Sequence, residues 1–500
     1  MSVAVGPSGT NSEYLQQLDD FLEHASTMEQ LQQYDDTFTL ARMVQQLQPV
    51  KEQLVFFMGS GSNQHNQLLL RSKDNVATLR NGQDAIQWTE CLACLPEAND
   101  WVVQLYAGGG HSAMLTQSGR LLLFGWNESG QLGSPPKMHD PKQIDSTIPI
   151  PVLSELKGIH VKDAALGFSH TLIIEQDTHR LYAFGDNTRG QVDGRLSDDA
   201  PSYCFKPMTP LFCGQHDAIV SIAAGVFHSA AVTDQGELLT FGYLRSGVAF
   251  SSDMLSSNDS KYGMSRWKPL DGSRIVQVAC GQHHTVALDH LGRLWTFGDN
   301  TYGQLGRTIV MESAPDETPK TKMTRDLVPR LVSVSETFDS IVCGWSHCFA
   351  MKRSADSNHH GMTHVYGWGR NDKGQLGTGT PNKDDDVTAM IPYPTLLWKD
   401  RPTTKDCITA TTNHEPWIQS IVCGSESSHV LDIHDTLWAC GWNEHGNLGM
   451  SMKDECCSRL TQIGTTRIPT TPCYGKDVRT CMAAGGAHVL AMNVRELQNN

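Results

Sequence analysis

Histidine is the side chain of this sequence with the widest chemical range, because an imidazole transfers protons near neutral pH and binds metal ions. The chain holds 21 histidines. Seven of them follow a glycine at short spacing and precede small or apolar residues: His111, His170, His228, His284, His347, His429 and His488. A reaction needs one catalytic base, whereas a histidine in every copy of a repeat is typical of a structural element. We therefore predict that each of these histidines hydrogen-bonds a neighbouring backbone group.

Motifs for covalent, metal or phosphate chemistry are not found in the sequence. Cys91 and Cys94 form a CxxC pair with no second pair or HxxxH at zinc spacing. Neither GxSxG nor HExxH occurs, and glycine-rich turns such as GWGRNDKG lack the GKS or GKT of a phosphate loop. Three cysteines precede a glycine at one phase of the repeat, which indicates small buried residues: Cys280, Cys343 and Cys423. We expect no covalent catalysis, no metal site and no cofactor.

A second motif alternates with the histidine segments and indicates the elements that position them. It consists of an apolar or aromatic residue, a glycine, a turn and Gly-Gln-Leu-Gly, as in LFGWNESGQLG from Leu123 and TFGDNTYGQLG from Thr296. Runs such as RLLLFG and RLWTFG are typical of short strands that end where a glycine adopts positive φ. The histidine segments are almost continuously apolar, which predicts a second type of strand that is buried on both faces.

The number and order of the two motifs predict the architecture. Each occurs seven times, and most histidine spacings lie between 56 and 63 residues, which suits one four-stranded blade. The chain enters on a turn motif and leaves on a histidine segment. This pattern predicts an all-β, seven-bladed β-propeller that is closed by both termini and so has no open sheet edge. The propeller is expected at residues 55–493, with a short tail at 494–500.

The segment before the propeller has a different pattern. Between Glu13 and Leu47, apolar residues recur at helical spacing, and acidic residues outnumber basic ones. We predict that residues 1–54 form an acidic, amphipathic helical extension with a disordered start. Such an extension packs on the propeller or binds a partner.

Charge and composition limit the partners. The net charge of −15 opposes non-specific binding to nucleic acid. No apolar run is long enough to span a membrane, no secretory signal is visible, and 14 cysteines are too few for a disulfide scaffold. We expect a monomeric protein of the cytoplasm, with the nucleus as an additional location. We expect neither direct binding to nucleic acid nor insertion into a membrane.

The alternation of GxxH[ST] with [FY]GxNxxGQLG resembles the regulator of chromosome condensation repeat family, over residues 55–493. The resemblance implies a seven-bladed propeller that works by binding proteins. It also implies guanine nucleotide exchange on a small GTPase, with a non-catalytic scaffold in trafficking, cytoskeletal or ubiquitin pathways as the alternative. Light sensing, a third role in the family, needs clustered tryptophans, and only Trp345 occupies the relevant phase here.

Propellers carry function on loops, so insertions in the repeat are candidate binding sites. Further residues are inserted at 244–268 and 307–330, but the largest insertion lies between His347 and His429. It contains an acidic cluster followed by prolines and tryptophans: Asp384, Asp385, Asp386, Trp398 and Trp417. With exposed aromatics, this segment would be a partner-docking loop. An ordinary disordered insertion is the alternative.

Overall fold

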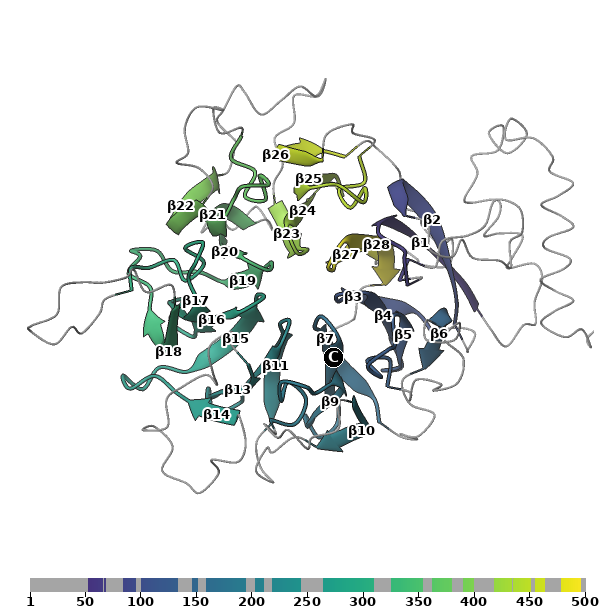
Figure 1. Cartoon of the computed structure of the whole chain (residues 1–500), viewed down its shortest axis with the longest axis horizontal. Coiled ribbons are helices and arrows are strands. Elements are labelled where there is room, and N and C mark those ends of the chain that lie inside the picture. The colour runs from purple at the N-terminus through teal and green to yellow at the C-terminus, as the bar shows by residue number, and fades with distance from the viewer. Residues whose placement is uncertain are drawn as a thin grey trace, which may run out of the picture.

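Seven four-stranded blades surround a central axis in the computed structural model (Figure 1). Blades I to VI follow one another along the chain, from β3–β6 to β23–β26, and blade VII consists of β27, β28, β1 and β2. A single bridge between Met362 and Ile418 joins the sheets of blades V and VI. The structure describes residues 53–65, 67–68, 84–95, 100–133, 146–151, 159–194, 203–210, 218–243, 264–309, 325–353, 362–379, 390–399, 418–433, 435–450, 455–463 and 478–495.

The first strand of each blade lies nearest the axis (Figure 1). These strands are β3 (Val102–Ala107), β7 (Val161–Leu166), β11 (Ile219–Ala224), β15 (Ile275–Cys280), β19 (Ser340–Cys343), β23 (Ile418–Cys423) and β27 (Val478–Ala484). A tight hairpin joins each to the second strand. The second strands are β4 (His111–Thr116), β8 (His170–Glu175), β12 (His228–Thr233), β16 (His284–Asp289), β20 (His347–Arg353), β24 (Ser427–Asp432) and β28 (His488–Arg495).

The second strands are the apolar histidine segments. All six residues are buried in β4, β8, β12, β16 and β24. Successive side chains point to opposite faces of a sheet, so burial at every position means that a neighbouring blade covers each face. In β4, Met114 packs toward blade VII and Ala113 packs toward blade II. The predicted two-sided burial of these strands is confirmed.

The third strand carries the second motif and ends at its glycine or at the next residue. These strands are β5 (Leu121–Gly125), β9 (Leu181–Asp186), β13 (Leu238–Gly242), β17 (Leu294–Asp299), β21 (Met362–Arg370), β25 (Leu437–Trp442) and β1 (Gln53–Gly61). Gly125 has φ 102° and Gly298 has φ 112°, a conformation that a residue with a Cβ adopts only at a cost. The positive φ predicted for these glycines is confirmed.

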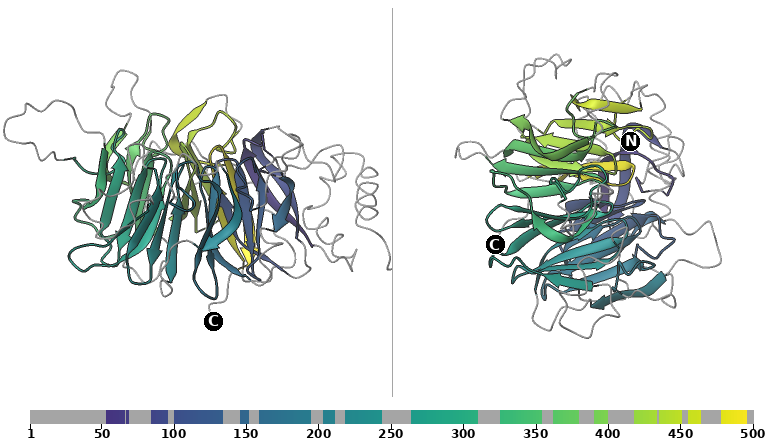
Figure 2. Two further views of the ribbon diagram at one scale, coloured as in Figure 1. Left: turned by 60° about the horizontal axis from the view of Figure 1, so that its bottom comes forward. Right: turned by 60° about the vertical axis from the view of Figure 1, so that its left-hand side comes forward.

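The fourth strand lies at the rim of the ring (Figure 1). These strands are β6 (Ser146–Pro151), β10 (Tyr203–Pro210), β14 (Met264–Trp267), β18 (Arg325–Leu331), β22 (Met390–Lys399), β26 (Cys456–Gln462) and β2 (Ala85–Leu95). In blades III, IV and V the fourth strand lies within a segment that the sequence presents as an insertion. Figure 2 shows that the strands of the blades run between two broad faces of the ring.

A hydrophobic cluster fills each interface between neighbouring blades. Between blades I and II, for example, Leu123 packs with Ile173 and Phe184. In blade VII, β28 pairs antiparallel with β1, with Met58 opposite Ala491, and β1 pairs with β2. The predicted all-β, seven-bladed propeller is confirmed. The predicted helical extension at residues 1–54 lies outside the described residues, apart from the first two residues of β1.

Candidate functional site: the hairpin face of the propeller

The second strand of six blades begins with a histidine whose ring is buried against the hairpin of its own blade. A Cβ on Gly281 would collide with the imidazole of His284, and the same is true of Gly344 and His347. The glycine that precedes each repeat histidine is therefore needed to make room for the ring. In each case the glycine N–H also donates to the histidine carbonyl, as Gly281 does to His284 at 2.9 Å.

Each of these six rings hydrogen-bonds a side chain of the next blade. We call this contact the inter-blade hydrogen bond. From Nε2, the partners and distances are Thr171 for His111 (3.0 Å), Ser229 for His170 (2.9 Å), Thr285 for His228 (3.0 Å), Cys348 for His284 (3.0 Å), Ser428 for His347 (3.0 Å) and Ser112 for His488 (2.8 Å). The sequence analysis expected a backbone partner, whereas the structure inserts a hydroxyl or thiol.

The hydroxyl that bonds the histidine also donates a hydrogen bond to a backbone carbonyl. Thr171 donates to the carbonyl of Gln131 at 2.9 Å, and Ser229 donates to the carbonyl of Gln191 at 2.7 Å. Since the single hydroxyl proton goes to the carbonyl, Nε2 of His170 must be the donor to Ser229. The glutamine of the Gly-Gln-Leu-Gly turn is thus held by its main chain to the adjacent blade.

Blade VI departs from this arrangement. Ser427, and not His429, lies opposite Gly441 at the position that histidine occupies in the other blades, while His429 lies opposite Ala439. The sequence alignment that made His429 equivalent to the other six is wrong by two residues. His429 is still buried, and its Nε2 lies 3.3 Å from Ser427 Oγ. In the next blade, blade VII, Val489 occupies the position that holds the hydroxyl or thiol acceptor in the other blades. The interface between blades VI and VII therefore lacks both the histidine and its acceptor.

Burial lowers the pKa of several repeat imidazoles. Removal from water, together with smaller contributions from the neighbouring His170 and His488, lowers the pKa of His111 to about 3. Burial likewise lowers the pKa of His170 and of His488 to about 3. A base this weak, already committed as a hydrogen-bond donor, is poorly suited to proton transfer at neutral pH.

The turn after the third strand is fixed by its own side chains. In blade I, Asn127 Oδ1 accepts the N–H of Leu132 and Gln131 Oε1 accepts the N–H of Ser129, both at 2.9 Å. The same pairs recur in blades II, IV and V. These turns and the hairpins between the first and second strands form one side of the ring, which we call the hairpin face.

A backbone hydrogen bond joins turn and hairpin in every blade. The residue after the turn glycine donates to the carbonyl of the residue before the second strand, as Trp126 does to Gly110 at 2.9 Å. The donors around the ring are Ser62, Trp126, Asp186, Tyr243, Asp299, Arg370 and Trp442, and the acceptors are Ala487, Gly110, Ser169, Phe227, His283, Ser346 and Glu426. The same backbone hydrogen bond forms in every blade although the side chains at the donor and acceptor positions differ. Folding therefore does not require a particular side chain at these positions.

Aromatic rings gather on the hairpin face. His65 stacks on Trp126 at 5.2 Å, and Trp126 meets Phe168 edge-on at 5.9 Å. Phe168 of blade II then meets Trp345 of blade V at 6.1 Å, although these blades are not neighbours. Each of the four rings is partly exposed. Sequence analysis considered Trp345 by itself and missed this aromatic cluster, because its members come from different motifs.

Charged groups flank the aromatic cluster. Arg370 pairs with Glu426 of the next blade and with Asp372 at 2.6 Å, and its guanidinium lies 4.8 Å from the ring centre of Tyr302. The side chains of Arg370 and Glu426 are 21% and 19% exposed, so the pair is accessible from the surface. The face therefore combines partly exposed aromatics with arginine, the residue types that dominate protein-binding surfaces.

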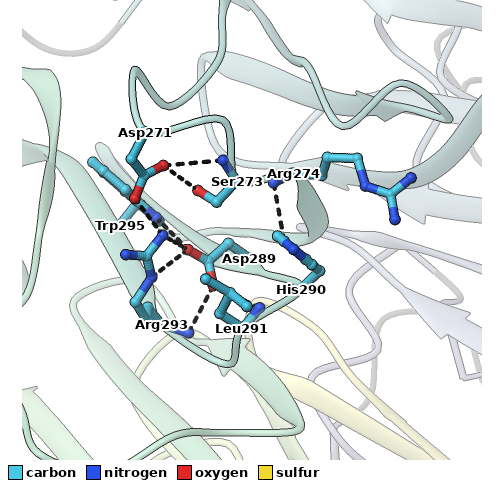
Figure 3. A network of polar contacts seen from close by, with 8 residues as sticks. All are labelled: Asp271, Ser273, Arg274, Asp289, His290, Leu291, Arg293 and Trp295. Atoms are coloured by element: carbon cyan, nitrogen blue, oxygen red, sulfur yellow. Dashed lines mark hydrogen bonds and ion pairs between the residues drawn. The ribbon is translucent and has the colours of Figure 1, made fainter.

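The opposite face carries hairpins that are stabilised within each blade. Figure 3 shows Asp289 accepting from Trp295 Nε1 at 3.0 Å and from the backbone and side chain of Arg293. Arg293 also contacts Asp271 at 2.7 Å, and hydrogen bonds from Ser273 help lower the pKa of Asp271 to about 2. Asp432 accepts from Trp438 Nε1 in the same way in blade VI. Because these groups satisfy one another, the network has a structural role.

The predicted docking loop is only partly described. Trp398 lies in β22, is 6% exposed, and stacks on Phe349 with ring centres 5.3 Å apart. The prediction that Trp398 is an exposed aromatic is therefore wrong: it fills the hydrophobic cluster between blades V and VI. Asp384, Asp385, Asp386 and Trp417 lie outside the described residues.

Comparison with known proteins now decides the family. The family model for the RCC1-like domain matches residues 54–491. The chain belongs to the RCC1-like domain family. The resemblance inferred from the repeats is thereby confirmed, and the matched residues begin in β1 and end in β28.

Named relatives match most of this RCC1-like chain. The secretion-regulating guanine nucleotide exchange factor of Mus musculus is 27% identical over 403 residues, which are 78% of this chain and 74% of the relative. The regulator of chromosome condensation of Mus musculus is 26% identical over 384 residues, 75% of this chain and 80% of the relative. The structure of Prp20p from Saccharomyces cerevisiae, studied with its binding to Gsp1p and histones, has a TM-score of 0.60 at 17% identity, over 91% of this chain and 93% of Prp20p.

Two further observations concern the setting of this RCC1-like chain. Within the described parts of the chain, no helical segment has the length and apolar character needed to span a bilayer. The nine cysteines whose side chains are described are all free thiols.

Proposed function

We propose that this RCC1-like protein regulates a small GTPase and that the GTPase binds to the hairpin face. The observation that carries the proposal is the aromatic cluster of Trp126, Phe168 and Trp345, with the Arg370–Glu426 pair beside it. Relatives named as exchange factors support the assignment to GTPase regulation.

The chemistry of the hairpin face suits a partner that is itself polar and charged. Partly buried aromatics supply apolar contact area at low entropic cost, while Arg370 and Glu426 offer a donor and an acceptor that can exchange partners on binding. Glu128 accepts from Trp126 Nε1 at 3.3 Å and is exposed. Its carboxylate can compete with a nucleotide phosphate for a lysine of the GTPase.

Exchange activity would need no covalent step. An exchange factor binds the nucleotide-free GTPase more tightly than the nucleotide-bound form, and this difference in affinity lowers the barrier to nucleotide release. The neutral, buried histidines hold the blades together in this scheme and do not contact the nucleotide. The proposal assigns activity to the face as a whole, and no single exchange residue is assigned.

Release of a fluorescent GDP analogue from Ran, Rab, Rho and Arf GTPases tests the proposal. We expect one class to release nucleotide faster in the presence of the full chain and to bind it best without nucleotide. Trp345→Ala and Glu426→Gln should reduce this effect at least tenfold, the loss typical of central interface residues.

Leu270→Ala is the matched control, since Leu270 is 97% exposed and precedes Asp271 on the opposite face. It should leave release and binding unchanged, and all variants should keep the thermal midpoint of the parent. Equal loss in Leu270→Ala and Trp345→Ala would argue against the hairpin face. Absence of both acceleration and binding for all four classes would refute GTPase regulation.

A non-catalytic scaffold is the second proposal, favoured by the variety of side chains at equivalent positions of the hairpin face. In that case the same aromatic cluster binds a protein partner in trafficking, cytoskeletal or ubiquitin pathways without altering nucleotide release. GTPase binding that does not depend on the nucleotide and does not accelerate release would favour this role.

Several expectations about the whole chain belong to the same proposal. We propose a monomer in the cytoplasm, with the nucleus as an additional location, whose ring is held closed by both ends of the chain. The free thiols support a reducing compartment. An acidic helical extension at residues 1–54 would recruit a partner or pack on the ring, and pull-down with and without these residues distinguishes the two.

A further inference from the structure

A cluster of one imidazole and two thiols lies between blades IV and V. His284 begins β16, Cys343 ends β19 and Cys348 is the second residue of β20. The three ligand atoms all lie within 4.8 Å of one another. We propose that His284, Cys343 and Cys348 bind a zinc ion, with water as the fourth ligand. The zinc site is independent of GTPase regulation.

Two of the distances between the ligand atoms are close to those of a tetrahedral zinc site. With Zn–S of about 2.3 Å and Zn–N of about 2.0 Å, tetrahedral geometry places two sulfurs about 3.8 Å apart and a sulfur and a nitrogen about 3.5 Å apart. The two sulfurs are 3.6 Å apart, and His284 Nε2 lies 3.0 Å from Cys348 Sγ. Zinc would require His284 Nε2 and Cys348 Sγ to separate by about 0.5 Å, which is within the range of side-chain rotation.

The cluster arises from one departure within the repeat, at Cys348. Cys348 stands where the other inter-blade hydrogen bonds have serine or threonine, as at Ser428 and Thr285. Cys343 lies directly opposite Cys348 in the hairpin, at a position that holds Ala107 in blade I. Folding of the ring thus requires neither thiol, since other blades form the same contacts without them. Among the described residues, this is the group of three whose ligand atoms come close enough to hold a metal ion.

The charges of the cluster also favour zinc. Two thiolates and a neutral imidazole around a dication give a complex with no net charge, which suits a site where His284 and Cys348 are buried. Cys343 is partly exposed, which gives water access to the fourth position. Cysteine binds zinc as the thiolate, so zinc binding releases thiol protons. Zinc affinity should therefore fall as the pH falls.

Zinc binding can be measured directly on the full chain. The protein is purified under reducing conditions, stripped with a chelator, and titrated with Zn²⁺ in competition with a chromophoric zinc indicator. We expect one zinc per chain by elemental analysis after gel filtration. Substitution by Co²⁺ should give the near-ultraviolet charge-transfer band of thiolate ligation.

The repeat itself supplies variants that should fold. Cys348→Ser restores the hydroxyl found in other blades, and Cys343→Ala introduces the residue of blade I. Each should lower zinc affinity more than the 10–100-fold seen when a group behind the ligands is lost. Cys280→Ala and Cys423→Ala are matched controls, because these cysteines hold the position of Cys343 in blades IV and VI and should keep full affinity.

Three results would overturn the zinc site. One is a parent chain that binds no zinc under these conditions. Another is a zinc affinity in Cys348→Ser and Cys343→Ala that equals that of the parent. A loss of zinc affinity in Cys280→Ala as large as in Cys343→Ala would count against the site in the same way. The third is a Cys343–Cys348 disulfide found by mass spectrometry of the freshly isolated, alkylated protein, which would assign the thiol pair to redox chemistry.

Discussion

At the residue scale, the inter-blade hydrogen bond explains why histidine recurs in the sequence. An imidazole is long enough to reach the next blade and donates from Nε2, while its ring packs over a glycine of its own hairpin. Six interfaces use this contact or its thiol variant. A repeated histidine therefore has a structural role at the blade interface, and burial is the main cause of the low pKa of His111, His170 and His488.

Loss of one repeat histidine should destabilise the ring. His170→Ala removes the bond to Ser229 and leaves a cavity beside the axis, so the free energy of unfolding should fall by roughly 2–4 kcal/mol. Urea denaturation monitored by tryptophan fluorescence measures this. His160→Ala, at an exposed position, should change stability by less than about 0.5 kcal/mol. A loss for His170→Ala as small as that of the control would contradict the role.

Acid should destabilise the protein before its carboxylates titrate. The pKa of His111, His170 and His488 is about 3 in the fold, against about 6.5 in an unfolded chain. Their folded-state pKa is lowered, so the stability that they contribute is complete above pH 6.5 and is lost as the pH falls toward 3. In that pH range, each histidine lowers the free energy of unfolding by up to about 1.4 kcal/mol per pH unit. Urea denaturation at pH 7.5, 6.5 and 5.5 should show the decline, and a flat profile would contradict it.

At the scale of elements, blade VI and blade VII test whether histidine and hydroxyl act as a pair. Ser427→His alone should destabilise, because Val489 offers its ring no acceptor. Adding Val489→Ser should recover roughly 0.5–1.5 kcal/mol, the value of one hydrogen bond. A double-mutant cycle in urea measures the coupling between the two sites. Additive effects would mean that the histidine and its acceptor are not coupled, and that both are missing from this interface by coincidence.

The hairpin between β16 and β17 should depend on one carboxylate. Burial opposes the charge of Asp289, but hydrogen bonds from Trp295 and Arg293 lower its pKa overall. Asp289→Asn removes the charge and should lower the free energy of unfolding by about 1–3 kcal/mol at pH 7. Because the stability from a carboxylate with a lowered pKa is lost in acid, parent and variant should converge below pH 4. Asp435→Asn, in an equivalent loop of blade VI, serves as the control for denaturant unfolding.

At the scale of the whole molecule, ring closure should govern cooperativity. Removing residues 1–52 leaves every described strand in place, and the thermal midpoint should stay within a few degrees of that of the parent. Removing residues 1–96 deletes β1 and β2, exposes the edge of β28, and should cause aggregation or a broad, low-temperature transition. Calorimetry and light scattering distinguish the two truncations. Similar melting of both chains would contradict closure by the chain ends.

Local patterns in the sequence were sufficient to predict the blades and their number. Strand burial depends on alternation and continuity of apolar residues, and the turn after Gly125 depends on positive φ, so both are readable from short segments. Sevenfold recurrence then fixed the count. The fourth strands of blades III, IV and V were read as insertions, since β14, β18 and β22 lie in segments without the repeat pattern.

Only the tertiary structure decided which side chains meet. Phe168 contacts Trp345 from a blade that is not its neighbour, Trp398 packs into an interface, and Ser427 replaces the histidine of blade VI. His284 likewise joins Cys343 and Cys348 across two blades. Spacing along the chain determines the repeat because each strand and turn folds from its own residues. The binding face and the thiol cluster depend on how the blades are arranged around the axis, which no single repeat encodes.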